Sequence, residues 1–186
     1  MPEGFLGDGL IFEEALPVTW AAGPLPDGLG LGRLNADNHQ LLGAEASLDE
    51  VRVHEALKDE SQALLNELQR LEYKVNILLR LTAELAMRSS GLPSPARVRL
   101  SSQGLEWFGD STPVVGETGL VSLYINPALP QPLKISCVVA SDRQDAGVRV
   151  VQLRFAGVSE QVIDMLEKLI FRHHRRLVAG ARLASN

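Results

Sequence analysis

The chain has 186 residues, a hydrophobic fraction of 45%, a charged fraction of 22% and a formal net charge of −5, as expected for an ordinary soluble globular protein. The acidic balance without a large basic patch argues against nucleic acid as the main partner. The apolar runs are too short to span a bilayer, the N-terminus lacks a signal-peptide pattern, and the single cysteine, Cys137, excludes an internal disulfide, so a cytoplasmic protein is expected.

Residues 1–46 are predicted to form an N-terminal extension with a possible barrel strand at residues 10–20. The segment Gly23–Gly32 is rich in Gly, Pro and Leu and is predicted to be a loop. Its run Gly28-Leu-Gly-Leu-Gly-Arg33 begins like a nucleotide-binding glycine loop, but the spacing fits neither the phosphate loop nor the dinucleotide fingerprint. Asn35–Leu48 is predicted to be a short helix.

Residues 47–90 are predicted to form a long helix, with Ser47 as its N-cap and Glu50 completing a capping box. Leucines recur every seven residues along it, and no Pro or Gly interrupts the sequence between Ala44 and Ser90. A strict seven-residue repeat is typical of a left-handed coiled coil. The predicted oligomerisation seam consists of Leu57, Leu64, Leu68, Leu71, Val75, Leu78 and Leu85.

The apolar face of this helix is wider than a two-stranded seam requires. Leu65 and Leu79 occupy e positions and Leu81 a g position, so we expect a homotetramer, with a dimer as the remaining coiled-coil alternative. The other alternative is a single amphipathic helix that lies across the core of its own domain.

Residues 91–186 change from a period near 3.5 to a period of 2, which predicts short strands. The strands are expected at 96–100, 104–108, 120–125, 133–141 and 147–156, with a polar hairpin loop at 142–147. Ser159 is predicted to cap a last helix, with an apolar stripe from Val162 to Ile170. The predicted fold class is α+β: a small antiparallel barrel with a C-terminal helix, plus the coiled-coil helix.

The order of these elements resembles the PilZ domain. The resemblance rests on the strand and turn of Val98–Phe108, then on Pro113–Gly119, Leu133–Ala140 and Val148–Phe155, and on the closing helix Ile163–Arg176. It implies a receptor for the bacterial second messenger cyclic di-GMP. Members of the family bind this ligand through Arg-x-x-x-Arg before the barrel and (Asp/Asn)-x-Ser-x-x-Gly on it.

Both motifs are altered here. Ser101 and Gly104 match the second motif, but Arg99 stands where Asp or Asn is expected, and a guanidinium cannot accept a guanine N–H. The first motif is missing before the barrel, and the only arginine pair at its spacing is Arg172 and Arg176, in the last helix. We therefore expect Arg99, Ser101 and Gly104 to be an inactive remnant. The long helix also resembles a tetramer-forming PilZ subclass that lost ligand binding.

Two functions follow from this resemblance. The first is a non-enzymatic assembly module that binds itself and an unknown regulatory protein, in second-messenger-linked processes such as pili, motility or virulence. The second is a working cyclic di-GMP receptor that uses the displaced pair Arg172 and Arg176. The histidines show no metal spacing and no serine has a nucleophile-elbow context, so neither a metal, a cofactor nor catalysis is expected.

Overall fold

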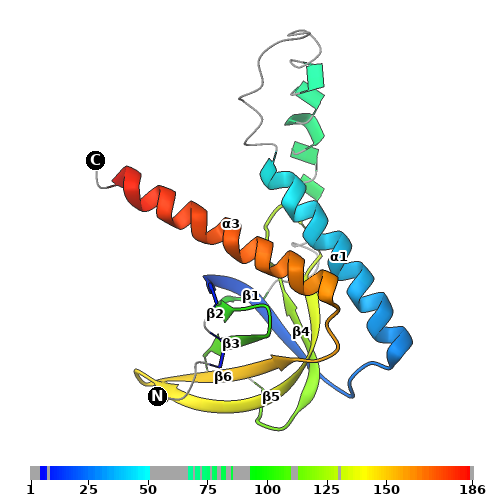
Figure 1. Cartoon of the computed structure of the whole chain (residues 1–186), viewed down its shortest axis with the longest axis vertical. Helices are drawn as coiled ribbons and strands as arrows, with labels where there is room; N and C mark the ends of the chain where they lie inside the picture. The colour runs from blue at the N-terminus through cyan, green and yellow to red at the C-terminus, as the bar shows by residue number, and fades with distance from the viewer. Residues whose placement is uncertain are drawn as a thin grey trace.

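The computed structural model describes residues 5–7, 9–50, 67, 68, 70, 71, 73–75, 77, 78, 81, 82, 85, 93–109, 113–129 and 131–184, without the side chains of 48–50 and 181–184. Its labelled elements are β1 (Phe12–Ala22), α1 (Gly28–Glu50), β2 (Pro95–Leu100), β3 (Gly104–Phe108), β4 (Thr118–Leu123), β5 (Leu133–Asp145), β6 (Val148–Phe155) and α3 (Glu160–Ala184). The strands form a barrel, and α1 and α3 cross beside it (Figure 1). The predicted α+β class with an antiparallel barrel and a C-terminal helix is confirmed.

The barrel is closed in the order β1-β2-β3-β6-β5-β4, and every pair is antiparallel. Strand β1 closes it by changing partner along its length. Phe12–Pro17 pair with β2, and Val18–Ala22 pair with β4. A barrel strand therefore comes from the N-terminal region, so residues 91–186 alone do not contain all the strands that close the barrel.

Alternation along the strands fills the barrel interior with aliphatic side chains. Val98 and Leu100 of β2, Leu105 of β3, and Val151 and Leu153 of β6 are completely buried in one core cluster. The residues between them, such as Arg99 and Glu106, therefore lie on the outer face of the barrel.

Helix α1 differs from the prediction at both ends. It begins at Gly28, where the Gly30 N–H donates to Asp27 Oδ1 at 2.7 Å, so the loop prediction was wrong beyond residue 27. It continues through Ser47, whose hydroxyl donates to the Gly43 carbonyl at 3.0 Å within the helix, so Ser47 is not an N-cap. Tertiary packing of the buried Leu42 against the barrel core outweighs the low helix propensity of the glycines.

Two asparagines of α1 attach it to the barrel and to the start of α3. Asn38 donates to the Lys134 carbonyl at 2.7 Å and accepts from the Lys134 N–H at 3.1 Å. Asn35 donates to the Gly157 carbonyl at 2.9 Å and accepts from the Ser159 N–H at 3.0 Å. These residues, predicted at the start of a short helix, instead fix α1 across the sheet.

Helix α3 follows the prediction closely. The Val162 N–H lies 3.4 Å from Ser159 Oγ, so Ser159 caps the helix as predicted. Val162, Leu166, Leu169 and Ile170 are buried against the barrel. The later part of the helix extends past the barrel (Figure 1).

The β5–β6 hairpin is longer than predicted. Asp142–Asp145 pair with Val148–Val151, so the loop predicted at 142–147 is reduced to a two-residue turn. In that turn Ala146 and Gly147 have φ of 50° and 82°, in the left-handed region that a tight hairpin of this kind uses. Because the polar residues stand on a pleated outer face, their polarity indicates exposure and not a loop.

Candidate functional site

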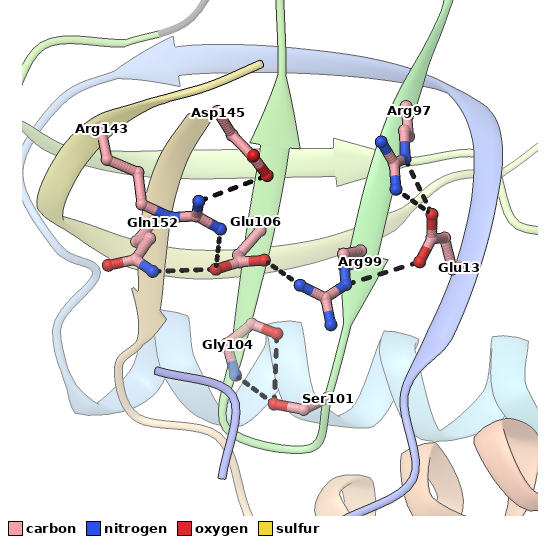
Figure 2. Close-up of polar contacts among 9 residues, drawn as sticks. All are labelled: Glu13, Arg97, Arg99, Ser101, Gly104, Glu106, Arg143, Asp145 and Gln152. Carbon is pink, nitrogen blue, oxygen red and sulfur yellow. Dashed lines mark hydrogen bonds and ion pairs between the residues drawn. The ribbon is translucent and has the colours of Figure 1, made fainter. Parts of the chain in front are cut away.

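Five polar residues form a row across the outer face of the barrel. Glu13 of β1 pairs with Arg99 of β2, Arg99 pairs with Glu106 of β3, Glu106 pairs with Gln152 of β6, and Gln152 pairs with Ser141 of β5. Directly opposed residues on one face lie close enough to bond. Figure 2 shows Glu13, Arg99, Glu106 and Gln152 of this row, with Ser101 and Gly104 of the altered motif below them.

Glu106 is the centre of this row, and only 3% of it is exposed. Its carboxylate accepts from Arg99 Nη1 at 2.8 Å, from Gln152 Nε2 at 2.8 Å and from Arg143 Nη2 at 3.3 Å. A buried carboxylate is tolerable only when its charge and lone pairs are matched in this way. Figure 2 shows Glu106 between Arg143 on one side and Arg99 on the other.

The arginines around Glu106 and Glu13 form further ion pairs. Arg97 bonds the Glu13 carboxylate, and Arg99 Nε lies 3.5 Å from the same carboxylate. Arg143 Nη1 lies 3.3 Å from Asp145 Oδ2. Each of these three arginines therefore contacts at least one carboxylate of the chain, and the sign of charge alternates from Glu13 through Arg99 to Glu106.

Ser101 and Gly104 both have structural roles at the turn between β2 and β3. Ser101 Oγ accepts from the N–H groups of Gln103 and Gly104, each at 3.2 Å, and the Ser101 N–H donates to the Gly104 carbonyl at 2.9 Å. A side chain at Gly104 would lie 2.8 Å from the Leu153 carbonyl oxygen and 2.9 Å from Phe5 Cε1. The N-terminal segment therefore crosses directly over this turn.

A cavity of about 420 Å³ lies beside the same turn. It is lined by the N-terminal segment, by Ser101, Ser102 and Gln103, and by Glu167 and Phe171 of α3. Within the described part of the chain its lining holds one carboxylate and no Lys or Arg. It therefore offers no cation to a phosphate.

The displaced arginine pair lies on α3. Arg172 donates to the carboxylate of Glu45 of α1, which is buried, and Arg176 lies one turn further on and is exposed. Arg172 thus joins the two helices. His173, next to it, is buried with its ring 4.1 Å from the ring of Phe12.

The predicted oligomerisation seam, between residues 57 and 85, is not part of the barrel face. Leu57 and Leu64 are outside the described residues, whereas the described positions from 67 to 85 are all helical. The other seam residues are between 49% and 66% exposed in the single chain: Leu68, Leu71, Val75, Leu78 and Leu85. These leucines and Val75 therefore form an apolar row that one chain leaves largely open.

The described residues contain no group of three or more metal-ligating side chains, and none of their helices has the length and hydropathy to cross a membrane. Burial raises the pKa of the Cys137 thiol to about 12, although a hydrogen bond with the Val121 backbone acts in the opposite direction. A thiol that is fully buried and protonated is not a nucleophile.

Sequence reasoning found Arg99, Ser101 and Gly104 but missed Glu106 and Gln152. The sequence did contain a signal for Glu106, which is the one charged residue in the otherwise apolar strand Gly104–Phe108. A carboxylate in a buried strand requires partners. Its partners Arg143 and Gln152 are 37 and 46 residues away, so no local pattern names them.

Comparison with known proteins identifies a family and a similar solved structure. A solved structure described as a pathogenic protein from Xanthomonas campestris, a tetrameric PilZ domain self-assembled through an unusual helical bundle, is 26% identical to this chain. The alignment covers 92% of this chain and 91% of that one, with a TM-score of 0.72. Curated proteins gave no match. Residues 42–183 match the family described as atypical PilZ domain, cyclic di-GMP receptor. The predicted resemblance is therefore confirmed, and the chain belongs to the atypical PilZ domain family.

Proposed function

We propose that this protein is a non-enzymatic PilZ assembly module that forms a homotetramer through its heptad helix and does not bind cyclic di-GMP. It acts by protein contacts, with a regulatory protein as a further partner, in second-messenger-linked processes such as pili, motility or virulence. The observation that carries the proposal is the set of ion pairs on the barrel face, where Arg99 and Arg143 both donate hydrogen bonds to the chain's own Glu106.

The barrel face lacks what the ligand requires. A cyclic dinucleotide presents two phosphates and guanine edges, which are recognised by unpaired guanidinium groups and by carboxylate or amide acceptors. At the motif position Arg99 offers donors only: Nη1 donates to Glu106, and Nε lies 3.5 Å from the Glu13 carboxylate. The ring of Phe5 lies against Gly104, where a ligand would need close approach to the backbone.

Support for self-assembly comes from the heptad row. Its described leucines and Val75 repeat at coiled-coil spacing and keep about half or more of their surface exposed. A monomer rarely leaves such a continuous apolar row open to water. The similar Xanthomonas campestris protein is described as a tetramer held by a helical bundle, which favours four chains over two.

Size-exclusion chromatography with light scattering tests the assembly. We expect a mass of about 81 kDa, four times the 20.2 kDa of one chain. A mass of one chain would refute self-assembly, and a mass of two chains would keep the coiled coil but refute the tetramer.

The second candidate function is a cyclic di-GMP receptor that uses Arg172 and Arg176, and the family description favours it. Against it, Arg172 is bonded to the buried Glu45. Titration calorimetry with cyclic di-GMP separates the two functions. Binding at tens of micromolar or tighter that disappears in Arg172→Ala or Arg176→Ala would establish the receptor and refute the proposal.

A further inference from the structure

The arrangement around Glu106 has the geometry of an anion-binding site. Two guanidinium groups from different strands, Arg99 of β2 and Arg143 of β5, converge on one carboxylate, with Nη···O distances of 2.8 and 3.3 Å. Guanidinium groups bind phosphate and carboxylate oxygens through the same charge-assisted hydrogen bonds. The difference here is that the anion belongs to the chain itself.

The two cations and the anion differ in access to water. The side chains of Arg99 and Arg143 are 31% and 41% exposed, whereas that of Glu106 is 5% exposed. The guanidinium groups thus reach the solvent on the outer face of the barrel, and the carboxylate lies beneath them. An external anion would meet both cations, but it would meet them already neutralised.

Glu106 is held in place from a third side. Gln152 Nε2 donates to Glu106 Oε1 at 2.8 Å, and the Oε1 atom of Gln152 is itself bonded by the Ser141 hydroxyl. The Gln152 side chain is therefore oriented so that its NH₂ group faces the carboxylate. Such preorganisation gives the intramolecular anion a large advantage over any dissolved one, because no association entropy is lost.

We propose that Glu106 is the built-in occupant of an anion site formed by Arg99 and Arg143, and that its charge excludes phosphate-bearing ligands from the barrel face. Neutralising Glu106 opens this site to an external phosphate. The inference rests on the proposed function, because it presumes that the native chain does not bind cyclic di-GMP. It goes further by naming the residue responsible for the exclusion.

The test uses the full chain and two variants, Glu106→Gln and Glu106→Ala, titrated calorimetrically with inorganic pyrophosphate and with cyclic di-GMP. Because a hydrogen bond to a charged group changes affinity about tenfold or more, we expect pyrophosphate to bind both variants at least about tenfold more tightly than the native chain. The affinity for cyclic di-GMP is expected to increase less, because the Phe5 ring still covers Gly104. The increase in pyrophosphate affinity should disappear when Arg143→Ala is added to either variant.

A matched control separates this effect from a general change in charge. Glu14→Gln removes the same charge from an exposed position of β1, one residue from the row, and should leave pyrophosphate binding unchanged. Circular dichroism shows whether each variant keeps its barrel, and the isosteric Gln is the variant that best preserves packing.

The outcomes distinguish a failure of the inference about Glu106 from a failure of the proposed function. Folded Glu106 variants that bind no pyrophosphate, or an equal gain in Glu14→Gln, would overturn the inference and leave the proposed function intact. Unfolding of both Glu106 variants would also overturn it, since the carboxylate would then serve the barrel and not ligand exclusion. Tight binding of cyclic di-GMP by the native chain would instead refute the proposed function.

Discussion

Two arginines on one strand should differ sharply in their contribution to stability. Arg97 and Arg99 are two residues apart on the outer face of β2, and each forms an ion pair with a glutamate. The side chains of Arg97 and Glu13 are 58% and 43% exposed, whereas only 5% of the Glu106 side chain that Arg99 contacts is exposed. The matched substitutions therefore remove the same type of side chain from two environments: Arg97→Ala from a solvent-exposed ion pair, and Arg99→Ala from an ion pair with a buried carboxylate.

The expected magnitudes follow from this exposure. Arg99→Ala leaves the buried Glu106 with Arg143 and Gln152 but without its shortest charge-assisted bond, which should lower the free energy of unfolding by roughly 2–3 kcal/mol. Exposed ion pairs contribute about 0–1 kcal/mol. Arg97 also lies 4.5 Å from the ring centroid of Phe108, which adds roughly 0.5 kcal/mol. Arg97→Ala should therefore cost roughly 0.5–1.5 kcal/mol, less than Arg99→Ala.

Urea denaturation followed by circular dichroism measures both values. All variants are compared at one protein concentration, because the stability of an oligomer depends on concentration. Equal losses for the two variants, or a larger loss for Arg97→Ala, would show that the burial of Glu106 does not increase the contribution of its ion pair with Arg99.

Three further predictions follow from the seam, the motif turn and the core. The double change Leu71→Glu with Leu78→Glu should reduce the mass in light scattering to that of one chain while the strand signal remains, because it buries unpaired charges in the seam; Tyr73→Glu, outside the seam, should keep the native mass. Gly104→Ala should lower the melting temperature, since its methyl group meets backbone at 2.8 Å, and an unchanged melting temperature would contradict the close packing. The Cys137 thiol should resist alkylation at pH 8 until the chain unfolds, because burial holds its pKa at about 12. Because this pKa lies above the unfolded value of 9.0, the contribution of the thiol to stability is complete below pH 9.0 and is lost as the pH rises toward 12; a denaturation midpoint that is flat over this interval would contradict it.

Local patterns in the sequence were sufficient for most of the fold. The alternation of Val151 and Leu153 with Gln152 predicts a strand without knowledge of the neighbouring strands. Ser159, as an N-cap residue, predicts the start of the last helix. Helix α1 was harder, because its glycines argue against a helix and only packing of residues such as Leu42 on the barrel overcomes them. The place of β1 depended on its pairing with β2, in which Glu13 lies opposite Arg99, and no local pattern contains a partner so distant along the chain.

The candidate site shows the same division. The altered motif at Arg99 was visible in the sequence, because a residue type that cannot accept a hydrogen bond replaced one that can. The reason this arginine is tolerated was not visible, since Glu106, Arg143 and Gln152 come together only through the barrel register. The seam leucines lie between these extremes: their spacing predicts a coiled coil, which stays a prediction because a second chain would have to supply the facing helix.

Sedimentation velocity of the native chain with cyclic di-GMP present tests the central claim most directly, since it reports assembly and ligand binding in one experiment. We expect a single species of about 81 kDa, four chains of 20.2 kDa, and at tens of micromolar ligand the guanine absorbance should not sediment with it. Guanine absorbance that travels with the protein, or a species of one chain, would contradict it.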